Sequence, residues 1–414
     1  MALYLLFLFL TISSKKKKGK IKLRYLIPTI IFMLPIVALA CVNIIYNTTV
    51  RPKPTVSELV LENSSIKLGN ASKVQPTTLD EFIDITANQI KLFHKEANDI
   101  WPRSSFENSV AYFITNDKKV AWKVNYDGTY YKLDDPKQMP KYGAILGYPV
   151  EFAMLDTQID GEKGMVIVIS KDELLDQQAY DKYTHLGMYD PIITYIHEGF
   201  HLYAQTKDDW INDSQNVSRE AFTNNVEGRK LRGYIMELLY EAIQDEYNRD
   251  LYTKQAIKLN QRYKADFPDE FASIKYLDKV EGTAFYYEVI SCLRTAYPDE
   301  INKDNYLDAA KLWTTNRPVE NTTLANKEAY EIGALSGILL DMSNNDKTKW
   351  KEELMKDPNL TPLDTLANLY TKEEIQNTPE PEISQEFSNK INESIKNGIA
   401  VKNNVIAFVY NIFF

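Results

Sequence analysis

Two histidines and a glutamate stand close together in the segment HEGFH, His197 to His201. Residues four apart lie on the same face of a helix, so both imidazoles can bind one metal ion. Glu198, beside the first histidine, can reach a water molecule on that ion and act as a general base. The chain has only 4 histidines in 414 residues, so two coincidental core or surface histidines rarely give this pattern. The segment predicts a zinc site in which His197 and His201 bind Zn2+.

A catalytic zinc site also needs a third protein ligand and one open position. Two glutamates are candidates for that ligand. Glu220, in the segment SREAF, follows His201 after 18 intervening residues, and Glu281 follows it after 79. Glu281 opens the octet EGTAFYYE, which ends at Glu288.

Together, HEGFH and this octet resemble the gluzincin metallopeptidases of the aminopeptidase N type, in which a second helix carries E-G-x-A-x-Y-x-E. The matching residues are Glu281, Gly282, Ala284, Tyr286 and Glu288. The resemblance implies that the first glutamate of the octet, Glu281, binds zinc. In the family about 18 residues separate the two elements, a spacing that Glu220 has instead. We prefer Glu281, because inserting a helical segment is easier than recreating the octet.

The predicted function is that of a zinc metallopeptidase, in which Glu198 takes a proton from a zinc-activated water that attacks the peptide bond. The sequence has no G-x-M-E-N segment, which binds a free amino terminus in the family, so we expect an endopeptidase. Tyr330 is a candidate for stabilising the oxyanion, with packing as its alternative role. His185, in a predicted loop, is a candidate for approaching the substrate. Two alternatives stay open: a non-catalytic zinc-binding surface module, or a zinc amidohydrolase with a non-peptide substrate.

The elements that must position these residues can be read from the surrounding sequence. Asp190 as N-cap and Pro191 in the first turn predict a helix that carries HEGFH. A capping box at Thr78 and Glu81 begins an earlier helix. Strands are expected at 109–115, 118–133 and 164–170, with a hairpin turn at 127–128. Helical signals continue from 190 nearly to 370, and the charges of the run 228–259 predict a solvated face.

The amino-terminal part predicts a membrane helix. The first 24 residues carry +7, and an uncharged stretch of 22 residues, 25–46, follows them. That stretch is long enough to cross a membrane, and the positive block places the remainder outside the cell. A cleaved signal peptide, or a lipoprotein site at the segment ALAC ending at Cys41, are the alternatives. With −9 over the whole chain, the other residues carry −16, which argues against nucleic acid as a partner.

The expected fold is therefore α+β: an N-terminal membrane helix, a zincin-like mixed lobe whose sheet packs on the HExxH helix, and a mostly helical C-terminal lobe. We divide the chain into a basic cytoplasmic segment (1–24), a transmembrane anchor or signal (25–46), a linker (47–76), a metallopeptidase-like domain (77–380) and a tail (381–414). The expected partners are a peptide or protein substrate and the cell membrane.

Overall fold

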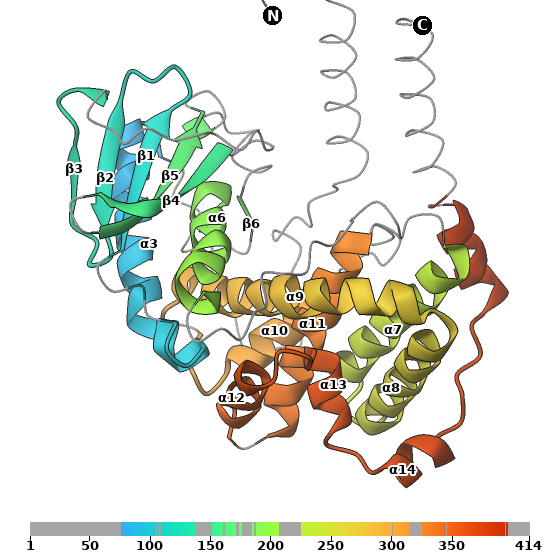
Figure 1. Cartoon of the computed structure of the whole chain (residues 1–414). Coiled ribbons are helices and arrows are strands. Elements are labelled where there is room, and N and C mark those ends of the chain that lie inside the picture. Colours follow the sequence, from blue (N-terminus) through green and yellow to red (C-terminus); the bar gives the residue numbers. More distant parts are fainter. Residues whose placement is uncertain are drawn as a thin grey trace, which may run out of the picture. The chain divides into compact units, whose positions relative to one another are not determined.

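Figure 1 shows a computed structural model of the chain. The residues that the structure describes are 76–104, 106, 109–136, 151–159, 162–170, 174–175, 184–185, 188–206, 225–299, 301–314, 325–344, 346–393 and 395. The contacts divide the chain into two units, and every helix and strand named below lies in the unit Lys53–Ile391.

A five-stranded sheet occupies the first part of this unit. Its strands lie in the order β3-β2-β1-β5-β4 and are β1 (Val110–Thr115), β2 (Ala121–Asn125), β3 (Tyr130–Lys132), β4 (Glu151–Ile159) and β5 (Glu162–Ile169). Strands β1 and β5 are parallel, and the other neighbours are antiparallel. The predicted hairpin is confirmed: β2 pairs with β3, and Gly128 in the turn has a φ of 79°, which favours glycine.

The central strands β1 and β5 are buried on both faces of the sheet. Phe113 of β1 and Ile167 of β5 belong to the main hydrophobic core, whereas their neighbours Tyr112 and Val166 belong to a second, smaller cluster. A strand that is buried on both faces needs apolar residues at successive positions rather than alternation. This explains the continuous apolar run at 164–170.

The first helix that the structure describes, α3 (Leu79–Ile100), packs against the sheet and buries the apolar residues Phe82, Ile83, Ile90 and Phe93. Its expected capping box forms only in part. The Thr78 hydroxyl accepts a hydrogen bond from the Glu81 backbone N–H at 3.1 Å, but the Glu81 carboxylate bonds to Thr77 instead of Thr78. The cap therefore involves Thr77 in addition to the predicted Thr78 and Glu81.

Most of the remaining described chain is helical. A short β6–β7 hairpin (Thr184–His185 and Met188–Tyr189) leads into α6 (Asp190–Gly199), which continues as the π-helix η4 (Phe200–Gln205). The later helices are α7 (Val226–Gln244), α8 (Arg249–Asp266), α9 (Pro268–Ala296), α10 (Tyr306–Thr314), α11 (Ala325–Ser343), α12 (Lys349–Lys356), α13 (Pro362–Ala367) and α14 (Lys372–Asn377). The long helix α9 contacts α3, α6 and α11, so it joins the sheet side to the helical side.

The prediction of an α+β fold is wrong. The described chain is mostly helical, with one small sheet and a two-stranded hairpin. The strand signals in the sequence were real but local, because they lie within residues 110–189, and the main core is built largely by the helices after residue 190.

The N-terminal membrane helix belonged to the same prediction and is not supported. Residues 25–46 lie outside the described residues, as do the basic segment 1–24, the linker up to residue 75 and the tail from 396. None of the helices in the described part of the chain is both long enough and apolar enough to cross a membrane.

The charged run 228–259 differs from the prediction of a solvated face. It forms the two helices α7 and α8, and two arginines of α7, Arg229 and Arg232, are fully buried. Arg229 pairs with Glu328 of α11 and Glu270 of α9, while Arg232 lies 2.5 Å from Asp278 of α9. Buried charges of this kind need partners, and here the partners come from two other helices. The ion pairs thus connect α7, α9 and α11 at their shared interface.

Contacts with α7 continue beyond residue 380. The ring of Phe387 packs edge-on against Tyr234 with centroids 5.2 Å apart, and the Tyr234 hydroxyl donates to the Glu382 carbonyl at 3.2 Å. The predicted tail beginning at 381 therefore includes residues that pack on α7.

Candidate metal centre

The two histidines lie on one continuous helical segment made of α6 and η4. Helix α6 begins at Asp190 with Pro191 in its first turn, so the expected start is confirmed to within one residue, although Tyr189 rather than Asp190 is the N-cap. His197 lies near the end of α6, and His201 lies in the π-helix that follows. His197 is only 6% exposed, so its ring is held inside the protein.

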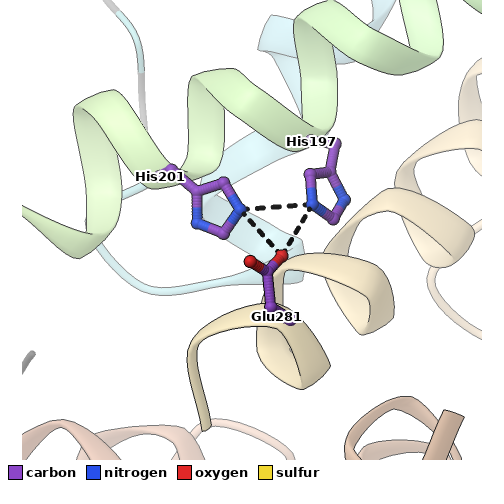
Figure 2. Close-up of side chains that lie close together, drawn as sticks. All are labelled: His197, His201 and Glu281. Atoms are coloured by element: carbon purple, nitrogen blue, oxygen red, sulfur yellow. Dashed lines mark hydrogen bonds and ion pairs between the residues drawn. The ribbon is translucent and has the colours of Figure 1, made fainter. Parts of the chain in front are cut away.

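Three side-chain atoms converge between this segment and α9, as Figure 2 shows. The Nε2 atoms of His197 and His201 are 3.2 Å apart, and Oε2 of Glu281 lies 3.4 Å from each of them. In a tetrahedral zinc site with ligand distances of roughly 2.0–2.1 Å, neighbouring ligand atoms are about 3.3–3.4 Å apart. The three atoms therefore match one face of such a tetrahedron.

The far side of each imidazole is also held by a hydrogen bond. His197 Nδ1 lies 2.8 Å from Oε2 of Glu288, and His201 Nδ1 lies 2.6 Å from Oε1 of Gln205. Both partners are acceptors, so each Nδ1 carries a proton, and Nε2 is the atom of each neutral ring that can bind a metal ion. This is the tautomer that binds a metal ion through Nε2.

The electrostatics of the group favour a positive charge between the three atoms. Burial by itself lowers the pKa of His197, but hydrogen bonds to Glu281 and Glu288 outweigh it and raise that pKa to about 10. Burial likewise raises the pKa of Glu281, yet hydrogen bonds from both histidines hold it well below its usual range. Both shifts describe the same preference: a proton is stabilised between these side chains.

Glu198 lies beside the group without belonging to it. Its side chain is half-buried, and burial raises the pKa of its carboxyl, which interacts electrostatically with His197, His201, Glu281 and Glu288. The group of described residues that could hold a metal ion, here called the metal group, consists of His197, His201 and Glu281. A carboxylate that lies close to a metal ion but does not ligate it can exchange protons with a molecule bound there.

The other candidates from the sequence have different positions. The ring of Tyr330, on α11, stacks on His197 with centroids 5.5 Å apart and an interplanar angle of 4°. His185 lies on strand β6, but its side chain is outside the described residues, and so is the whole of Glu220. His94 on α3 is the remaining histidine, and its Nε2 lies 2.8 Å from the Tyr195 hydroxyl within an aromatic cluster.

Close packing of α9 against α11 fixes the backbone beside Glu281. Gly282 and Gly333 face each other at the helix crossing, and a Cβ built on Gly333 would lie 2.3 Å from the Cα of Gly282. A Cβ on Gly282 would lie 2.6 Å from the Cα of Gly333. Only glycine permits this approach, which gives the glycine of the octet a packing role. The crossing brings Tyr330, three residues before Gly333, to the metal group.

Two contributors to the group were not assigned roles from the sequence. Glu288 is the last residue of the octet and follows Glu281 by seven residues, or about two helical turns. From that spacing, both carboxylates could have been predicted on one face of α9. Gln205 lies four residues after His201, which is also a same-face spacing. That spacing does not predict the partners of Gln205 on α9, because glutamine is common on helices and most glutamines have no such partner.

Comparison with models of known protein families, with curated proteins and with solved structures finds no match to this chain. The likeness to gluzincins therefore rests on the two sequence motifs.

Proposed function

We propose that this protein is a zinc-dependent metallopeptidase that cleaves peptide bonds within a chain. His197, His201 and Glu281 would hold the ion, and Glu198 would act as general base. The observation that carries the proposal is the triangle of two Nε2 atoms and one Oε2 atom with edges of 3.2, 3.4 and 3.4 Å, beside a carboxylate that is not part of it. A structural zinc site is normally closed by a fourth protein ligand and needs no base.

Zinc is proposed because two imidazoles, one carboxylate and an open position are a common catalytic set for this ion, although such ligands also bind other divalent metals. When bound, the ion would activate water and polarise the scissile carbonyl. Glu198 would accept a proton from the attacking water and deliver it to the leaving amine. Glu288 and Gln205 would keep the two imidazoles oriented, since each holds an Nδ1 proton.

The direct test is metal-dependent cleavage of a mixed peptide library by the purified full chain. We expect internal cuts that disappear after chelation and return when Zn2+ is added back, with sites mapped by mass spectrometry. Zinc retention in a one-to-one ratio without any cleavage would instead favour the non-catalytic module. Cleavage of small amides but not of peptides would favour the amidohydrolase.

Replacing Tyr330 by Phe tests whether its hydroxyl stabilises the oxyanion. Phenylalanine keeps the ring that stacks on His197, so metal affinity should not change. Loss of one oxyanion donor should lower kcat by about 10²- to 10³-fold. Tyr234→Phe on α7, which removes a hydroxyl that donates to the Glu382 carbonyl, is the control. An unchanged kcat in Tyr330→Phe would make Tyr330 a packing residue only.

A further inference from the structure

A chain of hydrogen bonds runs from the backbone of α9 to the second histidine. The Nε2 atom of Gln205 donates to the Val280 carbonyl at 2.8 Å and to the Thr283 hydroxyl at 3.0 Å. The Oε1 atom of the same side chain lies 2.6 Å from Nδ1 of His201. Gln205 is 4% exposed, so water does not compete freely for these bonds. One buried amide thus links the helix of Glu281 to the imidazole of His201.

The direction of every bond in this chain is set by its α9 end. A backbone carbonyl can only accept, so Gln205 must turn its NH2 group toward Val280. The Thr283 hydroxyl donates its proton to the Lys279 carbonyl at 2.7 Å and therefore also accepts from Gln205. Only the carbonyl oxygen of Gln205 then remains for His201. The proton of His201 must lie on Nδ1, which leaves the Nε2 lone pair for a metal ion.

The helix geometry brings Gln205 into this position. Gln205 follows His201 by four residues, as His201 follows His197, and the segment from Phe200 to Gln205 is a π-helix. Such turns are rare and often occur at functional sites. At its end, the Gln205 side chain reaches the α9 residues on either side of Glu281. The π-helix therefore carries a side chain that contacts both metal-binding elements.

We propose that Gln205 is a positioning residue, which selects the metal-binding tautomer of His201 and holds its ring toward His197 and Glu281. The inference rests on the proposed function and extends it. A primary amide can both accept from His201 and donate to α9, whereas a carboxylate only accepts and an ammonium only donates. The other tautomer of His201, with its proton on Nε2, would need the Gln205 amide to be flipped. The NH2 group of Gln205 would then face Nδ1 and its carbonyl oxygen would face the Val280 carbonyl, so the backbone of α9 selects against that tautomer.

The test is Gln205→Met, which keeps the length of the side chain and removes its hydrogen bonds. We expect zinc affinity to fall by about 10- to 100-fold, the usual effect of losing a partner that orients a metal ligand. Affinity is measured on the full chain by competition with a chelator of known strength. The absorption spectrum of the Co2+-loaded variant should also change, because His201 would no longer be held in one orientation. A purely structural role would not move that spectrum.

Gln244 provides a matched control. Its Nε2 atom, on α7, also donates to a backbone carbonyl and a threonine hydroxyl, those of Lys311 and Thr314. Gln244→Met therefore removes a similar pair of bonds, and neither acceptor contacts a histidine of the metal group. We expect this variant to keep the wild-type zinc affinity and Co2+ spectrum.

Three further variants extend the test, and the two at Thr283 keep it decisive if Gln205→Met folds poorly. Gln205→Glu retains an acceptor for His201 Nδ1, as Glu288 provides for His197, so it should bind zinc more tightly than Gln205→Met. Thr283→Val removes one anchor of the amide and should weaken zinc binding, whereas Thr283→Ser should not.

The outcomes separate this inference from the proposed function. Wild-type zinc affinity in both Gln205→Met and Thr283→Val would overturn the role of Gln205 while leaving the metal site intact. A wild-type chain that binds no divalent metal would instead overturn the proposed function, and this inference with it.

Discussion

Replacing Glu198 by Gln should leave zinc bound and reduce peptide hydrolysis by about 10²- to 10⁴-fold, the contribution of general acid–base catalysis. Glutamine keeps the size of the side chain and its hydrogen bonds but cannot accept and return a proton. Metal binding should survive because Glu198 lies outside the group of His197, His201 and Glu281. Zinc content and cleavage rate are measured on the same samples.

A matched control is Glu237→Gln on α7. Glu237 is also half-buried, and burial raises its pKa, as it does for Glu198. The variant therefore neutralises a comparable carboxylate, and we expect it to cleave at the wild-type rate. Wild-type cleavage by a zinc-loaded Glu198→Gln protein would contradict the peptidase mechanism. In contrast, His201→Ala should lose metal and activity together, since it deletes a ligand.

The parts of the site that were predictable depend on spacing within one helix. HEGFH places His197 and His201 on one face, and the octet begins with the carboxylate that meets them. Helical periodicity alone determines the placement of the two histidines on one face. The pairing of the two elements across 79 intervening residues came from the resemblance to gluzincins, because spacing within a helix says nothing about which helices will meet.

The features that were missed depend on contacts between helices. The burial of Arg229 and Arg232 arises because carboxylates of α9 and α11 converge on α7, so charged residues of an amphipathic run became part of the interior. The Gly282–Gly333 crossing and the bond of Gln205 to Val280 have the same origin. The prediction of the fold class was wrong for a related reason. The strand signals were easy to identify, but the share of the core that each element supplies depends on tertiary packing.

These contacts also explain how Glu281 is held in place. Asp278, which pairs with Arg232, lies three residues before Glu281 on α9. Gly282, which permits the close approach of α11, directly follows it. Glu281 is thus flanked by an ion pair on one side and a backbone contact on the other. Rigid support of this kind reduces the freedom that a ligand must lose when it binds a metal ion.

Changing Glu281 to Ala should abolish tight zinc binding and, with it, hydrolysis. The variant removes one of three proposed ligands and leaves the Nε2 atoms of His197 and His201 without the carboxylate that lies 3.4 Å from each. Loss of a supporting partner typically costs 10- to 100-fold in affinity, so loss of a direct ligand should exceed about 100-fold. Metal analysis after dialysis and a chelator competition measure the effect.

Two variants show whether this loss is specific to the ligand. Glu288→Gln, on the same helix, removes the charge next to His197 Nδ1 without deleting a metal-facing atom, so it should weaken zinc binding by no more than about 100-fold. Glu220→Ala tests the alternative third ligand, Glu220, which has the spacing typical of gluzincins. This variant should keep zinc near the wild-type level. The reverse result, zinc retained by Glu281→Ala and lost by Glu220→Ala, would transfer the third ligand to Glu220. The octet that begins with Glu281 would then be a packing motif.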